Sequence, residues 1–166
     1  MKVEDHNALR FILQDDIYLL EEDKLNYNNL PASQPEIKTP EVNFNYLGAN
    51  KKKFLILVHY PGHDFMADDH LTALESVLTR KNYSREDVAI FNMAKNQADH
   101  AMILDFFEPQ TLLILGQEPI PAGIDPPELN QVEKHNGLII LRTFSFGEMM
   151  TNTDNKRAFW EQVKSL

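Results

Sequence analysis

Four apolar runs divide the second part of the chain, and each of them opens into a polar loop. The runs are Phe54–His59, Val88–Met93, Thr111–Gly116 and Leu138–Thr143. Continuous apolar stretches of this length are typical of strands buried on both faces of a parallel sheet. The loops after them read HYPGHD, AKNQ, QEPIP and FSFGEMM. The pattern predicts a small α/β sheet, in which such loops normally carry the chemistry.

Helical patterns separate these runs. Apolar residues with helical spacing predict helices over 68–80 and 96–107, and a last helix that Thr153 or Asp154 caps. The segment His135-Asn136-Gly137 predicts a turn into the fourth strand. Alternating strands and helices imply right-handed crossovers. We therefore expect an α/β domain over residues 51–166, with three α/β/α layers and a mainly parallel sheet of about four strands.

Two segments precede this domain. Residues 1–20 carry apolar positions with helical spacing, interrupted by Asp15-Asp16, and indicate either a helix packed on the core or a helical arm that docks on a partner. Residues 21–50 contain three prolines and six asparagines and sustain no period, which indicates a linker or extension. Alternation over residues 42–46 adds a short edge strand as a further expectation.

Composition narrows the possible functions. The 166 residues, 43% of them hydrophobic, suffice for one domain with a core and an arm. The net charge of 16 − 25 = −9 argues against direct nucleic-acid binding and favours protein or small-molecule partners. The absence of cysteine excludes disulfides and thiolate metal sites and fits the cytoplasm. No apolar stretch reaches about 18 residues and no secretory signal is evident, so we expect a cytoplasmic protein without a membrane span.

The loop after the first run gathers potential metal ligands. His59, His63 and Asp64 lie within six residues of one another, and imidazoles and carboxylates bind zinc, iron or manganese. The sequence has no HExxH frame, however, and neighbouring acids suit the start of the next helix. We therefore predict a solvated loop, with a metal site as the alternative. Neither GxGxxG nor GxxxxGK[ST] occurs, and we expect no cofactor.

The third run ends in a segment with a specific resemblance. LLILGQEP resembles the water-activating GQDP segment of uracil-DNA glycosylases, with Glu118 in the place of the acid. In those enzymes the segment ends the first strand, whereas here it ends the third. Their HPSP-like histidine motif would fall at residues 142–146, which read RTFSF. No GxSxG elbow surrounds Ser145 either. We expect no catalytic site, and Glu118, His59 and Asp64 form the alternative catalytic set.

Three segments of the chain together carry a second resemblance: FILQDDIYLLEED, KKFLILVHYPGHDFMADDHLTALESVLTRKNYSREDVAIFN and the closing TNTDNKRAFWEQVKSL. Through these segments, most of residues 9–166 resembles the psi subunit of the bacterial DNA polymerase III clamp-loader complex. The resemblance implies a small α/β domain related in fold to uracil-DNA glycosylases but without their catalytic residues. It also implies that Lys156 and Arg157 form a basic pair before an aromatic, Trp160, that packs on the sheet.

This resemblance implies an adaptor in DNA replication. In that family the N-terminal arm docks on the clamp-loader ATPase subunits, and the α/β domain contacts chi, which binds single-stranded-DNA-binding protein. Carried to this chain, the docking residues are the apolar side chains of the arm: Leu9, Phe11, Ile12, Leu13, Ile17, Tyr18 and Leu19. We expect a non-enzymatic accessory subunit that binds clamp-loader subunits or other replication proteins. The alternatives are a glycosylase-fold hydrolase acting on nucleic-acid bases and a small-molecule or anion-binding α/β domain.

Overall fold

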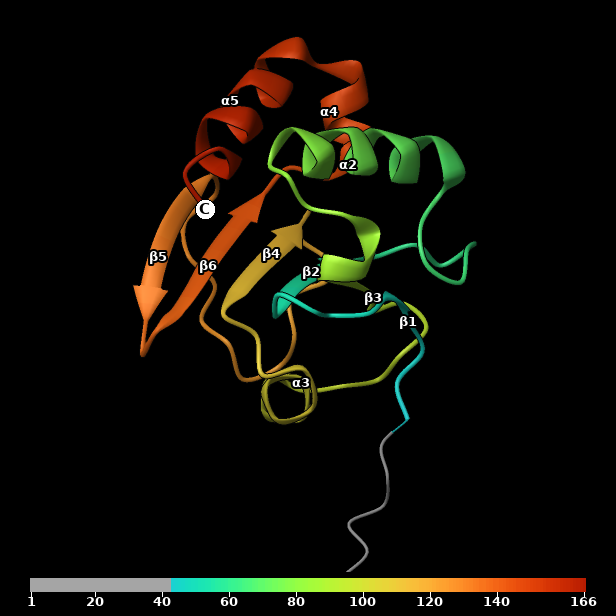
Figure 1. Cartoon of the computed structure of the whole chain (residues 1–166), viewed down its shortest axis with the longest axis vertical. Coiled ribbons are helices and arrows are strands. Elements are labelled where there is room, and N and C mark those ends of the chain that lie inside the picture. The colour runs from blue at the N-terminus through green and yellow to red at the C-terminus, as the bar shows by residue number, and fades with distance from the viewer. Residues whose placement is uncertain (1–42) are drawn as a thin grey trace, which may run out of the picture. The chain divides into compact units, whose positions relative to one another are not determined.

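A six-stranded mixed sheet forms the middle layer of residues 43–166, the part of the chain that the computed structural model describes (Figure 1). Its strands are β1 (Tyr46–Gly48), β2 (Phe54–Val58), β3 (Val88–Asn92), β4 (Thr111–Leu115), β5 (Gln131–His135) and β6 (Leu138–Thr143), in the order β1-β3-β2-β4-β6-β5. The four inner strands run parallel, and β1 and β5 pair antiparallel at the two edges. The α/β class is as predicted, but the sheet has six strands and is mixed, rather than about four strands that are mainly parallel.

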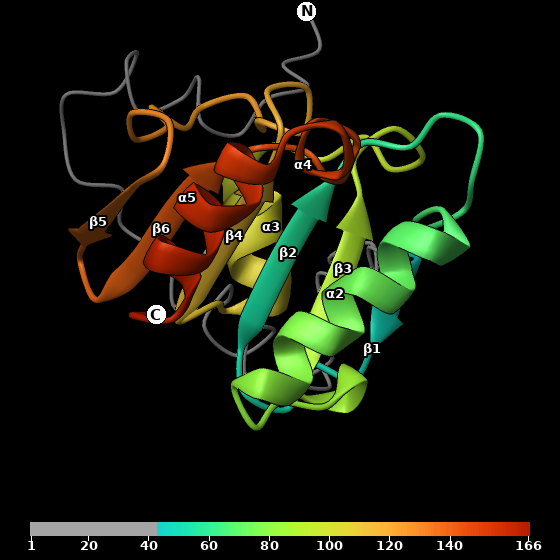
Figure 2. The ribbon, with the colours of Figure 1, turned by 90° about the horizontal axis from the view of Figure 1, so that it is seen from above.

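Helices cover both faces of this sheet (Figures 1 and 2). One face carries α2 (Asp68–Arg80), α4 (Phe146–Thr151) and α5 (Thr153–Val163), and the other carries α3 (His100–Phe107). A short 3-10 turn, η2 (Arg85–Asp87), precedes β3. Within these residues no helix is long and apolar enough to cross a membrane.

The apolar runs form strands because they pack against helices on both sides. In β2, Phe54, Ile56 and Val58 join the core under α2, α4 and α5. The alternate residues Leu55 and Leu57 join the core under α3. All five are at most 3% exposed. Successive side chains of a strand point to opposite faces of the sheet. Because helices cover both faces here, every position of the run is buried and apolar.

Local signals fix the helix ends. The helix predicted over 68–80 is α2. The second helix begins at His100 rather than at residue 96, because the carboxylate of Asp99 caps it by accepting from the Met102 N–H at 2.9 Å. In the last helix, neither Thr153 nor Asp154 is the cap. The Asn152 side chain takes this role by accepting the N–H of Asp154 at 2.9 Å.

Both edge strands lie where the sequence signal is weak. The predicted turn before β6 is confirmed: Asn136 and Gly137 have φ of 50° and 86°, as a two-residue hairpin requires. The strand before it was missed because β5 reads QVEKH and is largely exposed. At the other edge, β1 lies within residues 21–50, where the predicted linker carried the expectation of a short edge strand over 42–46, and it pairs antiparallel with β3.

The remaining N-terminal predictions fall outside the described residues. They concern the helical arm over residues 1–20, the linker over residues 21–42 and the docking residues Leu9 to Leu19. These expectations remain untested predictions.

Candidate functional site

The carboxyl ends of the parallel strands are organised by a buried asparagine. Asn92, the last residue of β3, is fully buried. Its Oδ1 accepts the N–H of Tyr60 at 2.9 Å and of Ala94 at 3.1 Å. Its Nδ2 donates to the carbonyls of Tyr60 and His63 at 2.9 Å and of Asp64 at 3.3 Å. Asn92 therefore holds the HYPGHD loop against β3, a role that the sequence did not reveal.

Tyr60 and His70 connect this loop to two helices. The Tyr60 hydroxyl lies 2.7 Å from Nδ1 of His70, and the His70 ring stacks on Phe146 with centroids 5.9 Å apart. Burial, reinforced by the charge of Asp69, raises the pKa of Tyr60 to about 12. The phenol therefore stays protonated near neutral pH. These contacts position the start of α2 and the start of α4 relative to the loop.

The three predicted metal ligands do not form a metal site in the described part of the chain. His59, His63 and Asp64 are all exposed. Within residues 43–166 no three His, Asp or Glu side chains come together in a way that would hold a metal ion. The loop shape depends on Asn92 bonds to backbone atoms rather than on a set of converging ligands. The alternative metal site thus has no supporting geometry in the described part of the chain.

Glu118 and Ser145 lie in the loops after β4 and β6. Glu118 is exposed, and its carboxylate lies beside Gly116, where an added Cβ would come 3.2 Å from Oε2. Ser145 caps α4: its hydroxyl accepts the N–H of Glu148 at 3.3 Å, and the Glu148 carboxylate accepts the N–H of Ser145 at 2.8 Å. Ser145 is therefore explained by helix capping. Neither it nor Glu118 lines the two surface depressions described next.

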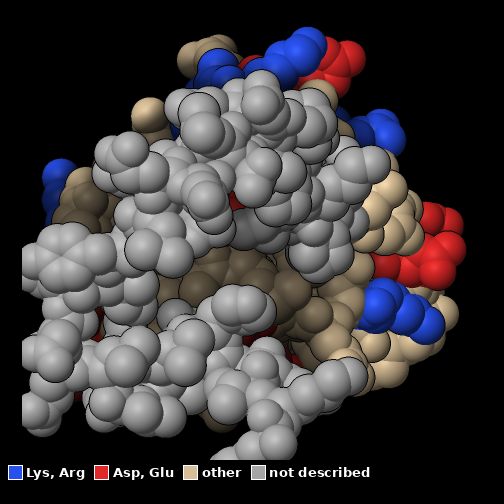
Figure 3. Space-filling model, turned by 90° about the horizontal axis from the view of Figure 1, so that it is seen from below, with Lys and Arg blue, Asp and Glu red and all other residues tan. Residues whose placement is uncertain are grey.

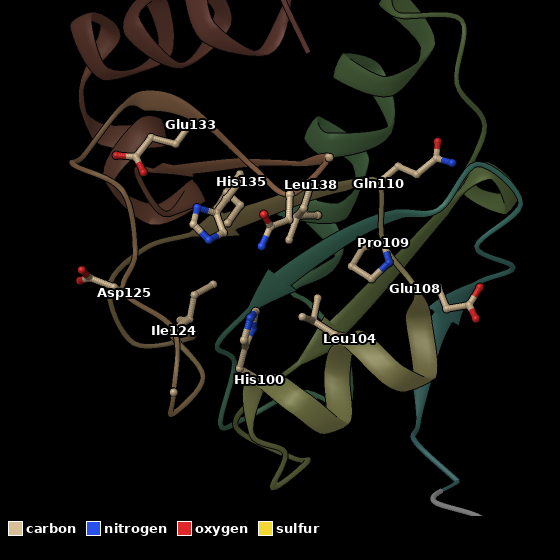
Figure 4. A pocket seen from close by; sticks show the side chains of 14 residues that line it. His100, Leu104, Glu108, Pro109, Gln110, Ile124, Asp125, Glu133, His135 and Leu138 are labelled. Carbon is tan, nitrogen blue, oxygen red and sulfur yellow. The ribbon is translucent and has the colours of Figure 1, made fainter.

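The larger depression, which we call the α3 hollow, lies elsewhere. It has a volume of about 800 Å³ and is enclosed by α3, the loop at 123–125 and the β5–β6 hairpin (Figure 4). Its walls include Gln110 before β4 and Leu138 at the start of β6, so it lies at the amino ends of these strands. Ligand sites of open α/β sheets lie at the opposite, carboxyl ends.

The α3 hollow combines an apolar lining with acidic and histidine side chains. The lining includes Leu104 and Ile124, the carboxylates of Glu108, Asp125 and Glu133, and two histidines, His100 and His135. Among the described residues, no lysine or arginine lines it. Figure 3 shows the α3 face, where Lys and Arg as well as Asp and Glu are visible at the margin of the described part. The sequence has no local signal for this hollow, because its lining comes from three separate stretches of chain, residues 100–110, 123–125 and 133–140.

The second depression is an apolar groove between the three helices of the other face, which we call the tryptophan groove. Its volume is about 180 Å³, and its lining is Ala73, Val77, Arg80, Phe146, Met149, Met150, Lys156, Phe159 and Trp160. Phe146, Met149 and Phe159 are buried and form its floor. Met150 is 43% exposed, and Trp160 is half-buried. The aromatic that packs into the core is thus Phe159, at 4% exposure, and the expectation that Trp160 fills this place is wrong.

Two cations flank this groove. The Arg80 guanidinium from α2 lies 5.7 Å from the centroid of the Trp160 ring, and Lys156 enters from α5. Both side chains are exposed. Within residues 43–166 neither forms an ion pair, and no carboxylate lines the groove. Arg157, the other member of the basic pair, instead lies 3.8 Å from Asp154.

Comparison of the chain with protein-family models and with curated proteins gives no match. The interpretation of the function therefore depends on the geometry above and on the resemblance in the sequence.

Proposed function

We propose that this protein is a non-enzymatic adaptor that binds other proteins, and that its partners are subunits of the replication clamp loader. The observation that carries the adaptor role is the tryptophan groove, where a half-buried Trp160 and an exposed Met150 lie over an apolar floor. The resemblance to the psi subunit supplies the clamp loader as the specific assembly. The same proposal includes DNA replication as the process and a cytoplasmic location.

The groove has the physical character of a protein interface. Tryptophan, methionine and arginine are enriched in interfaces, and the side chains that dominate binding energy are often tryptophan, tyrosine or arginine. Trp160, Met150 and Arg80 meet around one apolar floor. Covering them removes apolar surface from water, which favours association by roughly 25 cal/mol for each Å² buried.

The polar loop residues support the same proposal. Asn92, Ser145 and Tyr60 each have hydrogen-bond partners that fix the local fold. The alternative catalytic set of His59, Asp64 and Glu118 is exposed and lines neither depression. A hydrolase would need these groups to converge on a bound substrate. The geometry thus favours the adaptor over the glycosylase-fold hydrolase.

The α3 hollow favours a second candidate function, the binding of a small molecule. Its volume of about 800 Å³ is within the range of ligand pockets, roughly 300–1,000 Å³. A bound ligand stabilises the folded state by mass action. A screen for ligands that raise the melting temperature would test this function. Hits that lose their effect in an Ile124→Asp variant would support it.

Affinity purification tests the adaptor proposal. The tagged full chain is expressed in its native cells, and copurifying proteins are identified by mass spectrometry. We expect clamp-loader subunits, and we expect to lose the ATPase subunits when residues 1–20 are deleted. Recovery of the same background proteins as with an untagged control would contradict the proposal.

A pair of matched variants tests the contribution of the groove. Met150→Asp places a charge at the rim of the groove, whereas Met102→Asp makes the same change on α3 at a similar exposure, 37% against 43%. We expect Met150→Asp to lose at least one copurifying partner and Met102→Asp to retain all of them. Equal recovery with both variants would remove the groove from the proposal.

A further inference from the structure

We infer that the tryptophan groove receives an acidic peptide segment of a partner protein, with one large apolar side chain inserted between α2, α4 and α5. This inference rests on the proposed adaptor function and names the chemistry of the segment that the groove selects. The juxtaposition that carries it is an apolar floor between two cations from different helices, with no carboxylate from residues 43–166 in the lining.

The size of the groove sets the scale of what enters it. Its volume of about 180 Å³ is well below the roughly 300 Å³ at which small-molecule pockets begin. This space suits one large side chain, such as phenylalanine or leucine, rather than a whole metabolite. The floor of Phe146, Met149 and Phe159 offers only apolar contact. Met150 and Trp160 lie beside this floor.

The charges around the groove determine the flanking residues of the peptide. Arg80 and Lys156 are exposed at the groove without a partner carboxylate in residues 43–166, although the whole chain carries a net charge of −9. The groove is thus locally cationic on an acidic protein. Complementary charge speeds encounter and selects the partner, and a basic segment would leave like charges opposed. Aspartate or glutamate next to the inserted side chain satisfies both cations.

Arg80 links the two kinds of contact. Its guanidinium lies 5.7 Å from the centroid of the Trp160 ring, so the ring holds this donor near the apolar floor. A peptide carboxylate that accepts from Arg80 would lie next to the buried side chain. Charge-assisted hydrogen bonds of this kind are stronger than neutral ones. An apolar anchor next to an acid therefore engages the groove better than either group alone.

The only tryptophan of the chain makes a direct test possible, because Trp160 lies in the groove itself. The probe is a synthetic peptide with a phenylalanine–leucine pair among aspartates and glutamates, titrated into the full-length protein. We expect a saturable change in tryptophan emission that weakens as salt rises, since the pairing ions become screened. Two further peptides, one with lysines replacing the acids and one with serines replacing the apolar pair, should give no saturable change.

Charge reversal in the protein supplies the matched comparison. The variant Arg80→Glu/Lys156→Glu reverses both exposed charges at the groove. We expect its affinity for the acidic peptide to fall at least about tenfold, which corresponds to a loss of about 1.4 kcal/mol of binding free energy. In the control Lys95→Glu/Lys134→Glu, the same charges are reversed at exposed lysines outside the groove, and we expect unchanged affinity. Circular dichroism checks the fold of each variant, and the single Arg80→Gln and Lys156→Gln variants replace any double variant that does not fold.

Several results would overturn the inference. These are no binding to the wild type, equal binding of the lysine peptide, or unchanged binding by Arg80→Glu/Lys156→Glu. Peptide binding that occurs only after deletion of residues 1–20 would assign the groove to the chain's own N-terminal segment. If the wild-type protein self-associates and Arg80→Glu/Lys156→Glu does not, the groove binds a second copy of this chain. If the wild type copurifies clamp-loader subunits but the peptide does not bind, the inference fails and the adaptor function stands; if the peptide binds and no subunit copurifies, the proposed function fails.

Discussion

Replacement of Asn92 by alanine is the sharpest test of how the loop after β2 is held. The change removes five side-chain hydrogen bonds from a fully buried position, three of them 2.9 Å long. The three short bonds contribute about 1 kcal/mol each, and the Tyr60 N–H left without a partner adds about 1 kcal/mol more. We therefore expect Asn92→Ala to lower the free energy of unfolding by about 4 kcal/mol.

Urea denaturation followed by the emission of Trp160 measures this loss. The matched control is Asn96→Ala, which removes longer and more exposed bonds to Asn45 at 3.2 and 3.3 Å, along with one bond of 2.9 Å to the Asn92 carbonyl. We expect this control to cost about 1 kcal/mol. A loss below about 1.5 kcal/mol for Asn92→Ala, or equal losses for both variants, would refute the assignment of Asn92 as the residue that fixes the loop.

Three further predictions concern the core, the high-pH limit and the sheet edge. Phe159→Ala should cost about 3–5 kcal/mol in urea denaturation, and Trp160→Ala under about 2 kcal/mol because Trp160 is half-buried; equal costs would contradict the placement of α5. Because the pKa of Tyr60 is raised from 10.0 to about 12, the unfolded phenol ionises first, and stability should fall as pH rises through this window. The free energy of unfolding of Tyr60→Phe should fall less over this pH range than that of the wild type. Parallel pH profiles of the two proteins would contradict the raised pKa of Tyr60. Gly48→Ala should cost more than about 3 kcal/mol, because its φ is 106° and its Cβ would lie 2.2 Å from a backbone oxygen of β3. Gly137→Ala, with φ of 86° and open space, should cost about 1 kcal/mol, and a similar Tm for the two variants would contradict the role of Gly48.

The parallel part of the sheet could be predicted because burial on both faces leaves a strong mark on the sequence. β2 reads FLILV and β4 reads TLLIL, and both are almost fully buried. α2 was also predictable, since Leu74 and Leu78 mark its buried face and Asp68 begins its first turn. These signals depend only on residues close together in the chain.

The exposed edge strand β5 could not be predicted with the same rules. β5 pairs with β6 through its backbone, so its side chains are free to be polar and exposed. α4 is only six residues long, too short for a helical period to be evident. Its capping box, Ser145 with Glu148, was present in the sequence and could have signalled its start.

The candidate site was the least predictable feature. The sequence predicted docking residues on the N-terminal arm, and it offered His59, Asp64 and Glu118 only as an alternative catalytic set; these three side chains are exposed and line neither depression. The tryptophan groove combines α2, α4 and α5, and its lining residues Ala73 and Trp160 lie 160 − 73 = 87 residues apart along the chain. Trp160, which the resemblance implied would pack on the sheet, is half-buried beside the buried Phe159, because one residue further along a helix rotates a side chain by about 100°.

The adaptor proposal is tested most directly by the size of the species that the protein forms with its partners. The material recovered with the tagged full chain is separated by size-exclusion chromatography with light scattering, and each fraction is quantified by mass spectrometry. The account predicts that the chain and clamp-loader subunits elute together in one peak at a constant ratio. Elution of the chain alone, at the mass of a free protein, would contradict it.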